Sequence, residues 1–301
     1  MPVVKANGIE LAYEDHGSRE SPAMLLIMGL GGQLTQWPSE YVDALVARGF
    51  RVIAFDNRDI GLSTHFDGQP APTMAEVATA LMAGLRPKLP FTLTDMAADA
   101  VGLLDALGID KAHLVGVSMG GMIAQLVAVE APERTLSLTS IMSSTGNPAM
   151  PQGKPEALAV LTGAPANDSE EALVDFGVLS VRAVESPAYP KDEQVLRERV
   201  RASVRRSSNP AGVARQIAAI LGDGDRRQRL ARLRVPTLVI HGADDPLVPA
   251  ACGEDTARSI NGAELKIIPG MGHDLPVELA NEIGDAIAAL ARRATNEVST
   301  A

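Results

Sequence analysis

The sequence of 301 residues has one cysteine, few aromatic residues and fewer basic than acidic side chains. Because Cys252 has no second cysteine to pair with, an intrachain disulfide and a cysteine-rich zinc site are both excluded. Lys and Arg total 27 against 37 Asp and Glu, a net charge of −10, and aromatic residues make up 3%. Nucleic-acid binders usually carry clustered positive charge and aromatic stacking surfaces, so we expect no nucleic-acid partner.

Long hydrophobic runs are missing as well. The longest apolar run, Ala23–Met28, is far shorter than the roughly 20 residues that span a bilayer. The first residues turn at Asn7-Gly8 and contain neither the apolar stretch nor the small-residue cleavage site of a signal peptide. We therefore expect no membrane partner, no secretory signal peptide and a cytoplasmic location.

Short apolar runs are present, and they are typical of buried strands. With 46% hydrophobic residues the chain can form a full core. Val3–Ala6 and Ile9–Glu14 flank Asn7-Gly8, a dipeptide that favours a tight hairpin. Short, mostly apolar runs alternating with helical patterns predict an α/β fold, with a mostly parallel central sheet flanked by helices. These runs are Ala23–Met28, Val52–Phe55, His113–Val117, Leu136–Met142, Thr237–Ile240 and Leu265–Ile268.

Helical patterns lie between the predicted strands. Thr94 is expected to cap a helix that ends at Gly108, and a second helix is expected to begin at Ser118 and end before Pro132.

The interval Thr145–Arg234 is too long for an ordinary connection between strands. It predicts a helical insertion over one end of the sheet, with helices near 169–183, 192–207 and 210–221. The core would then consist of residues 1–144 and 235–301, and the insertion of residues 145–234. A local basic run in the insertion predicts solvated helix faces rather than an anion site; its members are Arg197, Arg199, Arg201, Arg205 and Arg206.

Gly116-Val117-Ser118-Met119-Gly120 matches the G-x-S-x-G pattern between a predicted strand and a predicted helix. A nucleophilic serine needs this setting, because the flanking glycines let the backbone turn sharply and expose the hydroxyl. The start of the helix also offers unpaired N–H groups to a developing anion. We therefore expect Ser118 to be a catalytic nucleophile; a serine that only caps the helix is the alternative.

A serine hydroxyl becomes a good nucleophile when a base removes its proton and an acid orients that base. His273 follows the last predicted strand, whereas the other four histidines precede the serine or lie within strand runs. His273 is therefore the expected base. Asp245 is the expected acid ahead of Asp244, since adjacent residues at a strand end cannot both point inward. Ser143-Ser144-Thr145, after the preceding strand, holds no carboxylate.

An oxyanion hole needs two N–H donors, each of which can contribute about 2.7–4 kcal/mol to the transition state. One is expected from Met119, directly after the nucleophile. The other is expected from Met28-Gly29-Leu30-Gly31-Gly32, with Leu30 preferred and Gly31 as the second choice. A plain tight turn is the alternative for this glycine cluster.

Together these motifs resemble the α/β-hydrolase superfamily, in its serine esterase type with a helical cap. The resemblance extends from about Val3 to Arg293, with the insertion at the position of the cap. It implies an α/β-hydrolase fold whose cap is inserted before the strand that precedes the catalytic acid.

Two departures from the common family pattern are informative. The segment Asp56–Ser63 is similar to the family's D-x-R-G-x-G-x-S loop, with Asp59 in place of the usual glycine. Met28 stands where many members have histidine. Both features, with Gly270-Met271-Gly272-His273, resemble the subgroup of aclacinomycin methylesterase.

The expected function is hydrolysis of a small or medium, largely apolar carboxylic ester, methyl ester or lactone through an acyl-enzyme on Ser118. The resemblance argues against epoxide hydrolases and haloalkane dehalogenases, which have aspartate at that position. Carbon–carbon bond hydrolysis, cofactor-free perhydrolysis and a non-catalytic ligand-binding role stay open. No cofactor and no metal are expected, and the expected partner is a small-molecule ester. Gly31, Trp37 and Met142 are candidate substrate-binding residues, with core packing as the alternative.

Overall fold

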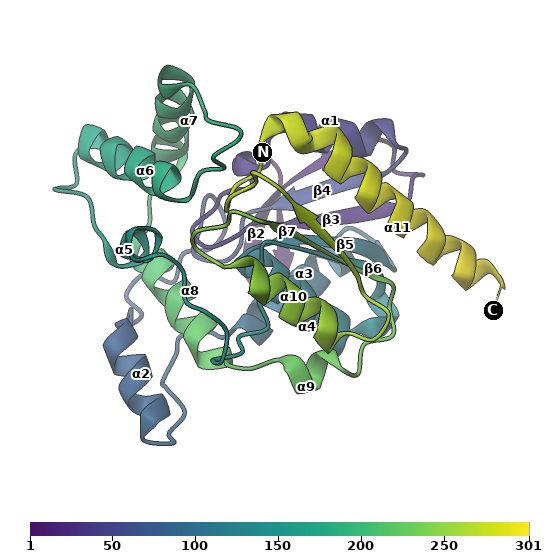
Figure 1. The fold of residues 1–301 in the computed structure, drawn as a ribbon, viewed down its shortest axis with the longest axis horizontal. Helices are drawn as coiled ribbons and strands as arrows, with labels where there is room; N and C mark the ends of the chain where they lie inside the picture. Colours follow the sequence, from purple (N-terminus) through teal and green to yellow (C-terminus); the bar gives the residue numbers. More distant parts are fainter. Residues whose placement is uncertain (301) are drawn as a thin grey trace.

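The computed structural model describes the backbone of residues 1–300 and the side chains of residues 1–161 and 163–295. One mixed sheet of eight strands forms its centre (Figure 1). The strands are β1 (Val3–Ala6), β2 (Ile9–His16), β3 (Ala23–Ile27), β4 (Arg51–Phe55), β5 (Ala112–Val117), β6 (Thr135–Ile141), β7 (Thr237–Gly242) and β8 (Glu264–Ile268). Their order is β1-β2-β4-β3-β5-β6-β7-β8. The pairs β1–β2 and β2–β4 are antiparallel and all others are parallel, which confirms the predicted mostly parallel sheet.

The strands form where the sequence predicts them, and for the predicted reasons. Asn7 and Gly8 have φ values of 47° and 80°, the left-handed conformations that a type I′ hairpin requires at both central positions. Every residue of β3, β4, β5 and β7 is buried. Continuous apolar sequence therefore marks strands that are covered on both faces.

Helices cover both faces of the sheet (Figure 1). The helices α1 (Ser39–Ala47) and α11 (Ala280–Thr300) pack on one face, where Leu26 and Ile240 are buried. The helices α3 (Leu93–Ala106) and α4 (Met119–Glu130) pack on the other, and α10 (Ala250–Ser259) lies beside β7 and β8. Short 3₁₀ helices are η1 (Leu34–Gln36), η2 (Pro132–Arg134) and η3 (Val277–Leu279). No helix in residues 1–300 combines the length and apolar character needed to cross a bilayer.

The start of α3 corrects one expectation. Thr92, not Thr94, caps this helix: its hydroxyl accepts from the N–H of Asp95, whose carboxylate accepts in turn from the N–H of Thr92. The acid three residues after Thr92 completes a capping box, whereas the residue three after Thr94 is Ala97. The predicted end is correct, since Gly108 has φ of 65° directly after the last turn.

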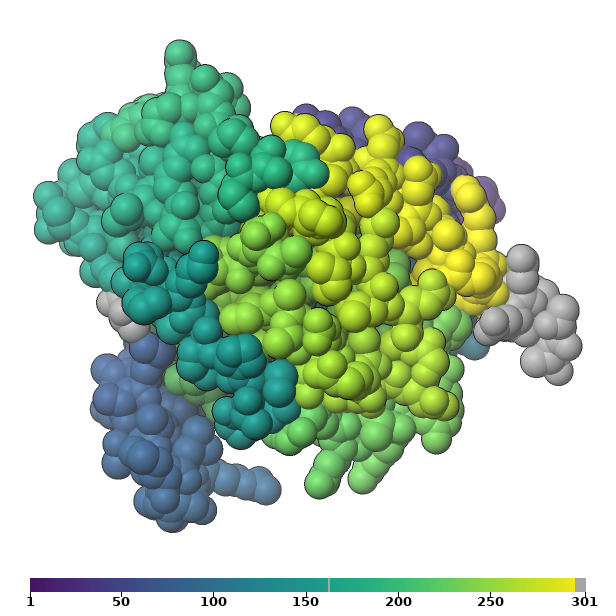
Figure 2. Space-filling view, viewed as in Figure 1, coloured from purple at the N-terminus to yellow at the C-terminus, as the bar shows by residue number. Residues whose placement is uncertain are grey.

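Five helices lie between β6 and β7, in the interval predicted to be a helical insertion. They are α5 (Pro155–Thr162), α6 (Glu170–Val184), α7 (Glu193–Arg206), α8 (Pro210–Asp223) and α9 (Arg227–Leu230). α6 and α7 lie away from the sheet and protrude beside the core in the space-filling view (Figure 2). They pack against each other around a small hydrophobic cluster of Val174, Val178 and Leu196. α2 (Met74–Met82) packs against α8. Across the chain, the sequence predicted α3, α4, α6, α7 and α8, and missed α1, α2, α5, α9, α10 and α11.

His113 in β5 should contribute to the pH dependence of stability. Its side chain is buried, and burial lowers its pKa from the ordinary 6.5 to about 4. The unfolded chain takes up this proton below pH 6.5 but the folded chain only below about pH 4. The free energy of unfolding should therefore fall by about 3 kcal/mol as the pH decreases between these values. Urea denaturation across this range should give a smaller pH slope for His113→Asn than for the wild type, and equal slopes would contradict this account.

Candidate active site

Ser118 occupies the junction between β5 and α4. Its backbone has φ 54° and ψ −121°, a conformation that side chains rarely adopt. A Cβ on Gly116 would lie 2.1 Å from the carbonyl oxygen of Gly120, and a Cβ on Gly120 would lie 2.0 Å from that of Ile27. The strand, serine and helix are thus packed so closely that both positions require glycine.

Gly120→Ala should destabilise the protein strongly. The new methyl group would meet the backbone oxygens of Ile27 and Met28, which cannot move aside as a flexible side chain would. Overpacking costs about 1–3 kcal/mol, and we expect the upper end of that range here. Chemical denaturation measures the effect. Gly284→Ala, where the nearest atom to the new Cβ lies at 3.3 Å, is the matched control; equal stability of the two variants would refute the prediction.

The structure brings Ser118, His273 and Asp245 together beyond the carboxyl ends of β5, β8 and β7. Nε2 of His273 lies 2.9 Å from Oγ of Ser118, and Nδ1 lies 2.7 Å from Oδ2 of Asp245. Asp244 points elsewhere, since its carboxylate accepts a hydrogen bond of 2.8 Å from the N–H of Gly270. Of the two adjacent acids, Asp245 is therefore the one that contacts the histidine.

The Asp245 carboxylate is buried among hydrogen-bond donors. Oδ1 accepts from the N–H groups of Leu247 (2.9 Å) and Val248 (2.8 Å), and Oδ2 lies 3.4 Å from Nε2 of His241. Burial raises the pKa of Asp245, but the charge of His273 and the hydrogen bonds from His241, His273 and Val248 outweigh it and hold the pKa well below its usual range. The ionised carboxylate fixes the tautomer of His273 that is protonated on Nδ1 and leaves Nε2 as an acceptor.

Two backbone N–H groups near Ser118 have no acceptor among the described residues, and loop 29–32, which follows β3, holds one of them. The N–H of Gly31 donates to Oε1 of Gln216 at 2.9 Å. The N–H groups of Leu30 and Met119 meet no protein acceptor within residues 1–300. Of the two alternatives that the sequence left for the loop donor, Leu30 is thus free and Gly31 is engaged.

The weaker substrate-binding candidates lie in different places. Met142 is 2% exposed and belongs to the core on the α1–α11 face. Trp37 lines a cavity of about 640 Å³ between segments 34–43 and 189–199. Its indole N–H has no hydrogen-bond partner in the described part of the chain. The serine, histidine and aspartate described above are not among the residues that line this cavity. Gly31 lies against α8.

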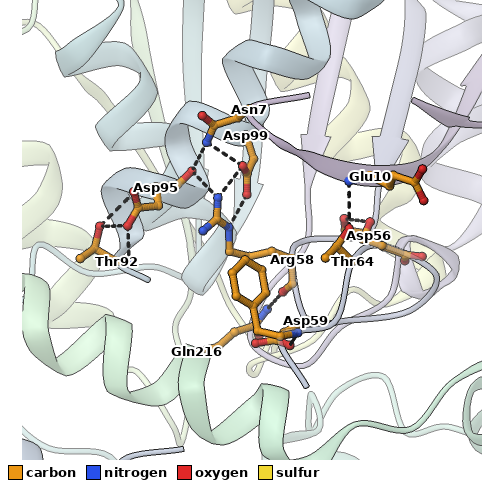
Figure 3. Close-up of polar contacts among 12 residues, drawn as sticks. Asn7, Glu10, Asp56, Arg58, Asp59, Thr64, Thr92, Asp95, Asp99 and Gln216 are labelled. Atoms are coloured by element: carbon orange, nitrogen blue, oxygen red, sulfur yellow. Dashed lines mark hydrogen bonds and ion pairs between the residues drawn. The ribbon is translucent and has the colours of Figure 1, made fainter. Parts of the chain in front are cut away.

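Loop 56–63, similar to a family motif in the sequence, is held by buried ion pairs, of which Figure 3 shows the pair between Arg58 and Asp99. Arg58 pairs with Asp99 of α3. Asp59 pairs with Arg215 of α8, with 2.7 Å between carboxylate and guanidinium. Asp59 has φ of 69°, a region that aspartate tolerates better than most residues. The ion pair explains how a residue other than glycine is accommodated there.

Arg206 corrects the prediction for the basic run. Arg197, Arg201 and Arg205 of α7 pair with acidic residues of α6 at the surface, in keeping with a solvated face. Arg206 lies instead 2.7 Å from the fully buried carboxylate of Asp56. No sequence pattern predicts this pair, because the two residues meet only when α7 docks on the core.

A hydroxyl, an imidazole and a carboxylate meet in this site, and the adjoining segments carry the free N–H groups of Leu30 and Met119. Such a set supplies a nucleophile, a base with its orienting acid, and anion-binding donors, which together can perform acyl transfer. Within residues 1–300, no three His, Cys, Asp or Glu side chains gather so that they could hold a metal ion.

Comparisons with known proteins show the family to which the fold belongs. The family model described as alpha/beta hydrolase fold matches residues 22–278. Rhodomycin D methylesterase DnrP from Streptomyces peucetius is 30% identical over 306 residues, covering 95% of this chain and 96% of that protein. Rhodomycin D methylesterase DauP from Streptomyces sp. (strain C5) is 28% identical over 312 residues, covering 97% and 98%.

A solved structure shows the same fold. A meta-cleavage product hydrolase from Pseudomonas fluorescens IP01 superposes with a TM-score of 0.76, covering 98% of both chains. At 20% identity this likeness concerns the fold alone.

Proposed function

Because the chain belongs to the α/β-hydrolase family, we propose that it cleaves carboxylic esters through an acyl-enzyme on Ser118. The match to the family confirms the fold expected from the sequence, and the two methylesterase relatives support the expected subgroup. The observation that carries the proposal is the hydrogen-bonded chain from Ser118 through His273 to Asp245. It lies at the carboxyl ends of parallel strands, where open α/β sheets place their sites.

Acylation uses the contacts of His273 with Ser118 and with Asp245. Oγ of Ser118 attacks the ester carbonyl carbon while its proton passes to Nε2 of His273, 2.9 Å away. The carboxylate of Asp245, 2.7 Å from Nδ1, stabilises the imidazolium that forms. When the tetrahedral intermediate collapses, His273 returns the proton to the departing alkoxide, and the alcohol leaves.

The negative charge of the tetrahedral intermediate is held by the N–H groups of Leu30 and Met119. Both are free of protein acceptors in the described chain, and Met119 begins α4, whose N-terminus favours an anion.

Deacylation repeats these reaction steps with water as the nucleophile. A water molecule in the place of the alcohol gives its proton to His273 and attacks the acyl carbon. Ser118 then leaves with the proton from His273, and the carboxylic acid is released.

We propose a small or medium, largely apolar ester as the substrate, and a methyl ester as the first candidate because both relatives above are named methylesterases. Residues 145–234 are the proposed cap. Helix α8 lies over the loop that carries Leu30: a Cβ on Gly31 would lie 3.2 Å from Cγ2 of Val213. An aliphatic cap residue beside the reacting carbonyl favours an apolar acyl or alcohol group.

The experiment that tests this function compares three chemistries on the purified protein. The substrates are p-nitrophenyl acetate, p-nitrophenyl butyrate and a set of methyl esters, then a vinylogous 1,5-diketone, then bromide with peroxide and acetate. We expect the highest kcat/KM with an ester. Faster turnover of the diketone or of bromide would replace the proposal with carbon–carbon hydrolysis or perhydrolysis. No turnover, together with no fluorophosphonate adduct on Ser118, would indicate a binding protein.

A further inference from the structure

Helix α8, from the insertion, packs directly on the loop that carries the proposed oxyanion donor. Gly31 has φ of 66°, and Val213 of α8 leaves little room above it. Gln216, one turn further along α8, is fully buried. The helix therefore contacts the loop through one aliphatic and one amide side chain, and the amide has no access to solvent.

The amide of Gln216 joins two loops of the core. Oε1 accepts the N–H of Gly31 at 2.9 Å, and Nε2 donates to the carbonyl oxygen of Arg58 at 3.0 Å (Figure 3). Arg58 is itself fixed by its buried ion pair with Asp99. The Arg58 carbonyl is thus a firm anchor, and Gln216 transmits its position to Gly31.

We propose that Gln216 is a positioning residue for the oxyanion hole, so that a helix of the insertion sets the geometry of the reacting site. Leu30 and Gly31 are consecutive, so fixing the N–H of Gly31 on Gln216 also limits how the peptide before Leu30 can rotate. The N–H of Leu30 is then held toward Ser118 with that of Met119. The inference rests on the proposed ester hydrolysis at Ser118.

The hydrogen bond from Gly31 to Gln216 also determines which N–H group of loop 29–32 is available to the oxyanion. Without an acceptor on α8, the N–H of Gly31 would compete with that of Leu30 for the oxyanion. An oxyanion donor must be aimed before the reaction to be effective. Gln216 removes the competing donor and leaves one defined partner in this loop.

Gln216→Met tests the proposal, because methionine has a similar volume but neither an amide donor nor an acceptor. We expect kcat to fall about 10- to 100-fold, the size of effect that a small misplacement of a catalytic group produces. KM should change by less than about 3-fold, because the interaction is made in the transition state. The affinity for a boronic acid that mimics the tetrahedral intermediate should fall by the same factor as kcat/KM.

Gln216→Glu is the conservative variant. Buried and protonated, its carbonyl oxygen accepts from Gly31 and its hydroxyl donates to Arg58, as the amide does. When the glutamate is ionised, it has no O–H group to donate to the Arg58 carbonyl. Burial favours the neutral form, so kcat should recover toward the wild-type value at lower pH. The ratio of variant to wild-type kcat should decline as the pH rises, a dependence that Gln216→Met should lack.

Asn209→Ala is the matched control for a loosened helix. Asn209 caps α8 and donates to the carbonyl oxygen of Asp59, and within the described residues its side chain makes no hydrogen bond to loop 29–32. If Gln216 acted only through stability, Asn209→Ala with an equal loss in Tm would lose as much kcat. That result, or an unchanged kcat in Gln216→Met, would overturn the proposal. Failure of the proposed function would be seen separately: the wild type would turn over no ester, or Ser118→Ala would keep full activity.

Discussion

Ser118→Ala should reduce kcat for ester hydrolysis by about 10⁶-fold, because no other nucleophile stands in its place. His273 Nε2 would then face a methyl group, and no acyl-enzyme could form. The free energy of unfolding should change by about 1 kcal/mol or less, because the Ser118 hydroxyl makes one hydrogen bond, to His273, and none to the start of α4. Steady-state kinetics and urea denaturation of the same preparation measure both quantities.

Ser180→Ala is the matched control for this substitution. Ser180 lies on α6, and its hydroxyl donates to the carbonyl of Phe176 one turn earlier. Its removal should leave hydrolysis at the wild-type rate. Retained activity in a folded Ser118→Ala protein would reject the mechanism.

Asp245→Asn should reduce kcat by about 10⁴-fold while the protein stays folded. The N–H groups of Leu247 and Val248 both point at Oδ1, so the amide oxygen of asparagine must take that position. The NH₂ group then faces Nδ1 of His273. This favours the histidine tautomer with its proton on Nε2, which cannot accept the proton of Ser118.

Asp244→Asn separates the role of Asp245 from a general effect of charge. It removes the same charge from the neighbouring position and keeps an oxygen to accept from the N–H of Gly270. We expect its kcat to stay close to that of the wild type. Similar losses in both variants would show that Asp245 has no special part in orienting the histidine.

The sheet could be predicted from the sequence because its inner strands are buried on both faces. Most such strands are largely apolar, although β6 also holds serine and threonine residues. Their ends fell within one or two residues of the runs in the sequence, as in β3 and β6. Helices α6, α7 and α8 were predicted from helical stretches of the insertion. In the structure each begins at a side-chain cap: Ser169, Asp192 and Asn209 accept hydrogen bonds from the first turn.

The missed helices have weaker local signals. In α2 only Val77 is buried, while Leu81 and Met82 are exposed, so the helix has no regular apolar face. The capping box of Thr73 and Glu76 indicates the start of this helix, but no regular spacing of apolar residues follows it to confirm the helix. α9 is a single turn of four residues.

The positions of Ser118, Asp245 and His273 were predictable because each follows a strand, and parallel strands bring their carboxyl ends to one edge. The residues that hold the site in shape were not. Arg206, Arg215 and Gln216 come from the insertion and meet loops 29–32 and 56–63 only after the helices dock. No spacing in the sequence encodes such contacts.

The most direct test of the central claim is the identity of the acylated residue. Rapid quenching of the protein with p-nitrophenyl butyrate, followed by mass spectrometry of the peptides, should find a butyryl group on Ser118. The same experiment on Ser118→Ala should find none. Steady turnover of the ester with no acyl group on Ser118 at any quench time would contradict the mechanism.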